Sequence, residues 1–135
     1  MRKQAISKCL PWIACVALTM MPSTAPAVCY QAPRTEVVLL PKFCWAQYCV
    51  PNARGPQYSI TGCGGFMNHY CPALIDLHLG TRSIGSGRRQ HLLVAKEGIL
   101  YTLRGMKRYP RCPIRAQVEA SLREVETLLR FTPDR

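Results

Sequence analysis

The sequence predicts a mostly α fold: a small disulfide-stabilised helical domain with a C-terminal antiparallel helical hairpin and a loop-rich, cysteine-containing N-terminal half. Three observations lead to this prediction. Apolar residues recur at helical spacing through residues 88–130. Prolines and glycines concentrate in residues 28–62. The chain has eight cysteines and begins with the features of an export signal.

The first 27 residues have the pattern of a cleaved signal peptide. Arg2 and Lys3 form a basic start, residues 9–21 are mostly apolar, and the small residues before and at Ala27 suit a signal peptidase. The apolar run of about 13 residues is too short to span a bilayer as a helix. We therefore expect cleavage after Ala27 and an exported protein, either periplasmic or extracellular.

Two alternatives to cleavage remain. An uncleaved signal would anchor the chain, and we expect insertion into a membrane only in that case. Lipid attachment at Cys29 is the other alternative, although Val28 is a poor residue to precede a lipidated cysteine. After cleavage, residues 28–135 form a single domain, with a loop-rich arm (28–62) followed by a helical part (63–135).

Cleavage changes both the cysteine count and the charge. It removes two of eight cysteines and three of 18 basic residues, so six cysteines remain and 15 Lys and Arg face seven Asp and Glu, a net charge of +8. Six cysteines in a short exported chain predict three disulfides, with 15 possible connectivities. The residues are Cys29, Cys44, Cys49, Cys63, Cys71 and Cys112.

The arm contains two short apolar segments. Residues 37–40 are β-branched in their first half and end at Pro41, which predicts an extended segment or a buried arm. Residues 43–49 suit one or two helical turns. In this second segment Trp45 and Tyr48 could offer apolar contact to a partner, but a place in the core or in a cleft wall is the simpler interpretation.

A cysteine- and glycine-rich stretch, residues 63–72, links the arm to the helices. Pro72 suits the first position of a helix, which predicts a short helix over residues 73–79 that ends at Gly80. Residues 81–87 are rich in serine and glycine, and they predict a flexible loop.

Residues 88–108 give the strongest helical pattern. One apolar face consists of Leu92, Ala95, Ile99, Leu103 and Met106. Glycines at positions 98 and 105 argue against an uninterrupted helix.

A second helix should begin at Pro113, with an apolar stripe made by Val118, Leu122, Val125 and Leu129. Acidic and basic residues four apart on its outer face form the pairs Glu119–Arg123 and Glu126–Arg130. The connection to the preceding helix is short, about four residues, so we expect an antiparallel hairpin.

Several chemical sites are conceivable in the stretch that follows the arm. Cys63, His69, Cys71 and His78 have the ligand types of a tetrahedral zinc site, but their spacing matches no common zinc motif. Cys63 or Cys71 beside His69 has the residue types of an activated thiol, yet no third group is placed to orient the histidine. The motifs GxSxG and HExxH, a phosphate loop and CxxCH are all absent. We therefore expect no cofactor and, in all, no enzyme.

A basic stripe is the main surface feature that the sequence predicts. Its members lie along the long helix and just beyond it: Arg88, Arg89, Lys96, Arg104, Lys107, Arg108 and Arg111. Such a field attracts anions, and outside the cytoplasm these are lipid headgroups, acidic polysaccharides and acidic proteins. No nucleic-acid module is recognisable, so no nucleic-acid partner is expected.

These observations predict an exported, basic helical binding or adaptor module that engages an acidic partner in the cell envelope. Two alternatives remain open. One is a small secreted enzyme, redox or metal protein that uses Cys63, His69 and Cys71. The other is a secreted effector, because small size, basic charge and disulfides suit that class equally well.

Overall fold

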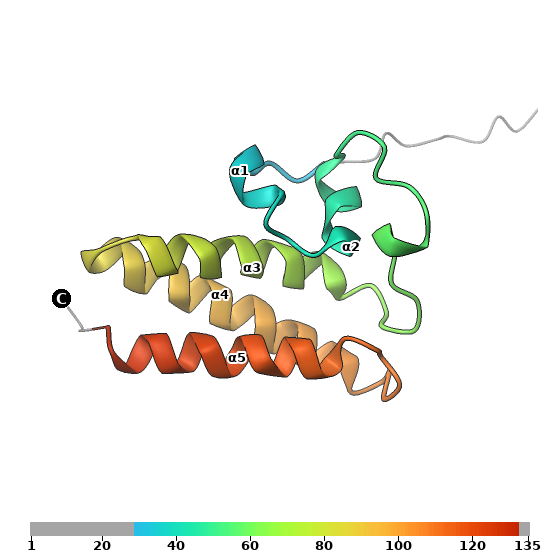
Figure 1. Cartoon of the computed structure of the whole chain (residues 1–135). Coiled ribbons are helices and arrows are strands. Elements are labelled where there is room, and N and C mark those ends of the chain that lie inside the picture. Colours follow the sequence, from blue (N-terminus) through green and yellow to red (C-terminus); the bar gives the residue numbers. More distant parts are fainter. Residues whose placement is uncertain (1–28, 133–135) are drawn as a thin grey trace, which may run out of the picture.

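The computed structural model describes residues 29–132, and every regular element in that range is helical. Three long helices dominate it: α3 (Met67–Arg82), α4 (Gly85–Met106) and α5 (Arg115–Arg130). In Figure 1 they form a stack in which α4 lies between α3 and α5. The predicted mostly α fold is confirmed.

Four short elements make up the arm. They are the α-helical turns α1 (Arg34–Val37) and α2 (Lys42–Trp45) and the 3-10 turns η1 (Ala46–Tyr48) and η2 (Pro56–Tyr58). Figure 1 shows them on the side of α3 that faces away from α5. The helical turns expected over residues 43–49 are therefore confirmed.

The core is built from all three long helices and from buried residues of the arm, and the expected apolar faces of α4 and α5 supply part of it. Leu92, Ile99 and Met106 of α4 are fully buried, as are Val118 and Val125 of α5. Leu103, Leu122 and Leu129 are partly buried and pack against the same cluster. The antiparallel α4–α5 hairpin is thus present (Figure 1), although its connection, residues 107–114, is longer than expected and α5 begins at Arg115, not at Pro113.

The extended segment predicted for residues 37–40 is wrong. The chain turns helically after Pro33, whose carbonyl accepts hydrogen bonds from the backbone N–H groups of Glu36 and Val37 at 2.9 and 3.2 Å. Val37 and Leu40 are buried, whereas the residues between them are exposed. Burial at positions three apart is a helical pattern, and it outweighs the β-branched composition of so short a segment.

The expected helix over residues 73–79 is also wrong in both its limits. It starts at Met67, so that Pro72 lies inside it, and it continues past Gly80 to Arg82. Proline removes one backbone hydrogen bond, but the first turn buries Met67 and Tyr70, and this burial favours the longer helix. Gly80 is needed for packing, because a Cβ there would lie 2.7 Å from the Leu92 side chain.

The flexible loop expected over residues 81–87 is largely absent. α3 ends at Arg82 and α4 begins at Gly85, which leaves Ser83 and Ile84 as the connection. This tight connection makes α3 and α4 an antiparallel pair in their own right, as Figure 1 shows.

Candidate functional site

Three disulfides hold the arm and the helices together. Cys29–Cys49 closes a loop within the arm, Cys44–Cys71 joins α2 to α3, and Cys63–Cys112 joins the segment before α3 to the α4–α5 connection. All six cysteines that were expected to be structural are therefore paired. The cysteine-rich half is tied to the C-terminal hairpin through Cys63–Cys112.

This pairing separates the residues of the conceivable metal or thiol site. Cys63 and Cys71 belong to different disulfides, so neither is a thiolate in this structure. Cys71 is buried, whereas His69 is exposed, because two positions along a helix turn the side chain by about 200°. Within residues 29–132, no group of three or more His, Cys, Asp and Glu side chains is placed to hold a metal ion.

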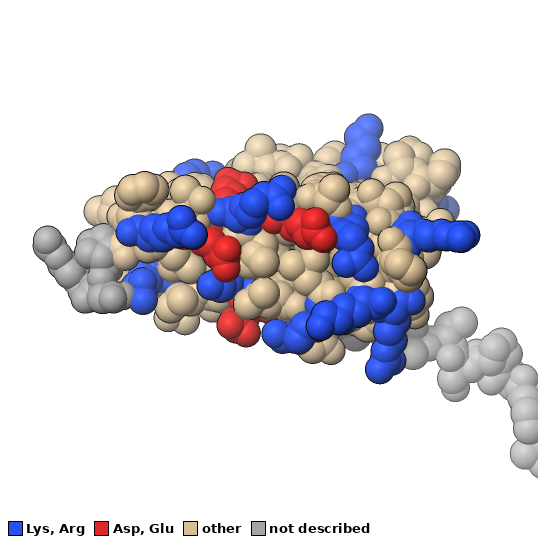
Figure 2. Space-filling view, turned by 90° about the horizontal axis from the view of Figure 1, so that it is seen from below, with Lys and Arg blue, Asp and Glu red and all other residues tan. Residues whose placement is uncertain are grey.

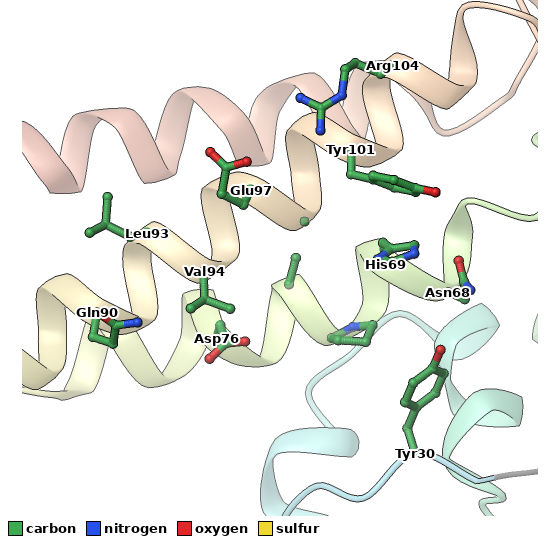
Figure 3. A pocket seen from close by; sticks show the side chains of 13 residues that line it. Tyr30, Asn68, His69, Asp76, Gln90, Leu93, Val94, Glu97, Tyr101 and Arg104 are labelled. Atoms are coloured by element: carbon green, nitrogen blue, oxygen red, sulfur yellow. The ribbon is translucent and has the colours of Figure 1, made fainter.

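An open groove of about 670 Å³ lies between α3 and α4, with Tyr30 of the arm at one end. Figure 3 shows its lining side chains. The groove residues are Tyr30, Asn68, His69, Pro72, Ala73, Asp76, Gln90, Leu93, Val94, Glu97, Gly98, Tyr101 and Arg104. We call this surface the α3–α4 groove.

Small residues bring the two helices close together under the groove. A Cβ on Gly98 would lie 2.8 Å from the Cβ of Ala73 and 3.1 Å from the carbonyl oxygen of His69. The backbone of α4 therefore touches α3 here, and short side chains form the floor. Two turns further on, Gly105 makes similar room for the ring of Phe66.

Aromatic and charged side chains line the two ends of the groove differently. At one end the ring centroids of His69 and Tyr101 are 4.1 Å apart, and the guanidinium of Arg104 lies 5.9 Å from the Tyr101 ring. Towards the other end the Asp76 carboxylate lies 2.8 Å from Nδ1 of His91. No sequence motif marks Tyr101, Asp76 or His91.

A signal for this groove was nevertheless present in the sequence. Residues 92–95 are four consecutive apolar positions, and a helix directs them around more than half of its circumference. Leu92 and Ala95 are buried, which leaves Leu93 and Val94 on the groove side. A second apolar face beside the buried one was therefore readable from the residue pattern.

The structure divides the predicted basic stripe into separate parts. Arg88 and Arg89 lie near the start of α4 and are half-buried. Lys96, in the middle, places Nζ 3.1 Å from the Glu126 carboxylate of α5. The predicted pairing of Glu126 with Arg130 is thus replaced by a salt bridge between the two helices.

The remaining four residues of the stripe gather at the end of α4 and on the connection that follows. Arg104, Lys107, Arg108 and Arg111 are all exposed, and we call this group the basic end. Seen from the side of α5, Lys and Arg side chains cluster at this end of the molecule, whereas Asp and Glu lie further along it (Figure 2).

Arg115, which the sequence reasoning passed over, orders the connection that carries the basic end. Its guanidinium donates to the carbonyl oxygen of Met106 and, at 3.5 Å, to that of Tyr109. These contacts satisfy a carbonyl at the end of α4. Together with Cys63–Cys112, they hold the connection against the body of the domain.

Trp45 and Tyr48 have structural contacts within the arm. Both are half-buried, and Nε1 of Trp45 donates to the Leu40 carbonyl oxygen at 3.0 Å. The Tyr48 ring lies 6.0 Å from that of Tyr30, and burial raises the pKa of Tyr48 to about 12. These contacts fit a place in the packing of the arm.

Nothing in the described range, residues 29–132, is a helix that combines the length and apolar character needed to cross a bilayer. No protein-family model, no curated protein and no solved structure matches this chain.

Proposed function

We propose that this protein is an exported, disulfide-stabilised adaptor module that binds an acidic partner in the cell envelope through its basic end. The observation that carries the proposal is the isolation of positive charge there. Arg104, Lys107, Arg108 and Arg111 are exposed, and residues 98–118 contain no Asp or Glu. Unlike Lys96, the basic end has no carboxylate near it along the chain.

Export is supported by two independent features. The first 27 residues have the composition of a secretory signal. The six cysteines beyond that signal form three disulfides, which persist in oxidising compartments such as the periplasm and the extracellular space.

The rigidity of the basic end supports a binding role for it. Its connection is anchored by Arg115 and by the disulfide of Cys112, so the backbone that carries Lys107, Arg108 and Arg111 is held against the domain. A fixed set of charges loses less entropy on binding than a mobile one. The partner should carry several negative charges, as an acidic protein, an acidic polysaccharide or an anionic lipid surface does.

Charge reversal at the basic end tests the proposal. A triple variant with Lys107→Glu, Arg108→Glu and Arg111→Glu should bind anionic probes about 100-fold more weakly, because each cation near an anionic surface contributes about 1 kcal/mol. The probes are polyglutamate, a polyuronate and vesicles that contain an anionic phospholipid. Binding of the unchanged protein should also weaken steeply as the salt concentration rises.

A second triple variant is the matched control. Lys42→Glu, Arg54→Glu and Arg123→Glu change the net charge by the same amount at exposed positions outside the basic end. The affinity of this control variant for the anionic probes should fall less than about tenfold, since only the general electrostatic field of the protein changes. Equal losses in the two variants would contradict the proposal, as would binding that is indifferent to salt. Circular dichroism of both variants should match that of the unchanged protein.

A further inference from the structure

The three disulfides differ in their access to solvent. The Cys29–Cys49 bridge joins an exposed cysteine, Cys49, to a half-buried one, Cys29. The four cysteines of the other two bridges are all buried. An external thiol can exchange with a disulfide only if it contacts one of the sulfurs, so access favours Cys29–Cys49 over both other bridges.

The accessible bridge lies in the wall of a hollow in the arm. This hollow has a volume of about 370 Å³, and we call it the arm pocket. Both cysteines of the bridge line it, together with the rings of Tyr30 and Tyr48 and aliphatic side chains such as Val38. Among the described residues, Arg34 is the one charged residue in this lining. A pocket that is mostly apolar, with a few polar groups, is typical of sites that bind small molecules.

We propose that the arm pocket binds a small thiol that carries carboxylates, and that this thiol exchanges with the Cys29–Cys49 bridge. The attacking thiolate forms a bond to Sγ of Cys49, the more exposed cysteine. The bond between the two cysteines breaks, and its electron pair goes to Sγ of Cys29, which takes up a proton from solvent. The products are a mixed disulfide at Cys49 and a thiol at Cys29. This inference goes beyond the proposed function and does not depend on it.

Arg34 gives the pocket its preference for an anionic thiol. It is exposed and lies at the first position of α1. A guanidinium binds carboxylates through charge-assisted hydrogen bonds, and a nearby cation also favours the thiolate form of a thiol. A volume of about 370 Å³ is near the lower end for ligand pockets, so the site suits a compound of tripeptide size.

The backbone of Cys49 favours opening of the bridge. Cys49 follows η1 with φ 49° and ψ 39°, in the left-handed region that residues other than glycine seldom adopt. Such a conformation persists only where the surrounding structure imposes it, and the bridge to Cys29 is one of the constraints. Once the bridge opens, the backbone at Cys49 can relax.

Exchange would also release Tyr30 from the end of the α3–α4 groove. Tyr30 follows Cys29 in the chain and lines both the arm pocket and the groove. Its backbone N–H donates to the Gln47 carbonyl oxygen at 2.9 Å, and its ring contacts that of Tyr48. Figure 3 shows Tyr30 extending from the arm toward α3. Because the two buried bridges stay closed, the groove would widen at this end while the long helices keep their packing.

Treatment of the exported protein with reduced glutathione, a tripeptide thiol that carries carboxylates, tests the site. After acid quenching and alkylation at early times, peptide mass spectrometry should find glutathione on Cys49 and the alkyl group on Cys29. The Cys29–Cys49 bridge should open at least about 100-fold faster than either other bridge, because the buried sulfurs are reached only after local unfolding. In the opened protein the amides of residues 30–32 should exchange hydrogen faster, and those of α4 should not.

A charge reversal tests the role of Arg34. Arg34→Glu should slow opening by glutathione about tenfold more than opening by 2-mercaptoethanol. Both compounds attack as thiolates, but only glutathione brings carboxylates to the pocket. Lys42→Glu is the matched control, since Lys42 is an exposed cation of the arm outside the arm pocket. It should slow the two thiols by the same factor.

Several results would overturn the inference. Three bridges that open at the same rate would show that access does not select Cys29–Cys49. Glutathione attached first to Cys29, or to a cysteine of another bridge, would place the attack elsewhere. If Arg34→Glu slows both thiols equally, or does no more than Lys42→Glu, the arm pocket does not recognise carboxylates. None of these results changes the expected response of the basic end to salt and to polyglutamate.

Discussion

Single glycines set the distance between α3 and α4. Gly98 lies against Ala73 and the carbonyl oxygen of His69, and Gly105 lies against the ring of Phe66. Neither position has the positive φ that favours glycine, so the requirement is space and not backbone freedom. From the sequence both glycines looked like weak points in the helix, because glycine costs about 1 kcal/mol relative to alanine in a helix interior.

Replacing Gly98 by alanine should therefore destabilise the protein although alanine is the better helix former. The new methyl group would meet Ala73 and backbone, which have little freedom to move, and overpacking of this kind costs about 1–3 kcal/mol. Denaturation by urea or guanidinium measures the change in unfolding free energy.

Gly87→Ala is the control within the same helix. A Cβ at Gly87 has open space around it, so this change should stabilise the protein, by up to about 1 kcal/mol. If both glycine variants are stabilised to the same degree, the close contact between α3 and α4 at Gly98 is wrong.

At the scale of elements, one ion pair connects the arm to the far end of α3. The Glu36 side chain is only 6% exposed and pairs with the guanidinium of Arg82. Glu36 lies in α1 and Arg82 in the last turn of α3, so the pair fastens a helix of four residues that has few other polar anchors. The second carboxylate oxygen of Glu36 is buried and has no hydrogen-bond partner in the described residues.

Removing the cation should release α1. In Arg82→Ala the buried Glu36 carboxylate loses its partner, and a buried charge without a partner is strongly unfavourable. We expect faster amide hydrogen exchange in residues 34–40, with little change in α5, measured by mass spectrometry.

A second substitution separates charge from packing. Adding Glu36→Gln to Arg82→Ala should restore much of the protection, because a neutral amide is less costly to bury than a carboxylate. Lys42→Ala, which removes an exposed cation from α2, should leave the exchange of residues 34–40 unaltered. If Arg82→Ala leaves that exchange unaltered too, the ion pair does not hold α1.

For the whole molecule, the disulfides constrain the unfolded chain by different amounts. The bridges Cys29–Cys49, Cys44–Cys71 and Cys63–Cys112 span 20, 27 and 49 residues. In the chain-entropy account these loops correspond to about 3, 3.5 and 4 kcal/mol at 25 °C. Each is a large share of the 5–15 kcal/mol that typically stabilises a domain.

Replacing the bridges one pair at a time by alanine should give a graded loss of stability. Loss of Cys63–Cys112 should lower the unfolding free energy most, by about 4 kcal/mol, because its loop is the longest. Loss of Cys29–Cys49 should cost about 3 kcal/mol and leave the helical circular dichroism of α3, α4 and α5 in place. Guanidinium denaturation of the three variants measures the order, and a reversed order would contradict the entropic origin of the effect.

Local patterns account for what the sequence predicted correctly. The apolar faces of α4 and α5 and the hairpin that they form follow from a repeat of 3.6 residues, which is visible in any short window. The structural role of the six cysteines follows from their number and from the signal-like pattern of the first 27 residues, which favours an oxidising compartment. The basic residues were also identified, although their division between Lys96, the start of α4 and the basic end was not.

The predictions that failed depended on distant partners. Pro72 and Gly80 are ordinary helix boundaries by composition, but burial of Tyr70 and contact with Leu92 keep both inside α3. The α3–α4 groove escaped notice because it needs α3 to continue beneath α4, and the short helix expected over residues 73–79 offered no surface of that length.

By itself, therefore, the sequence determined the helical class, the positions of the two C-terminal helices and the use of cysteine as a cross-link. Tertiary structure alone decided which of the 15 pairings forms, how far α3 extends, and that Tyr101, Asp76 and Arg104 share one groove. The physical reason is the range of the interactions. Helical periodicity is encoded within about four neighbouring residues, whereas a disulfide or a groove exists only when packing brings distant residues together.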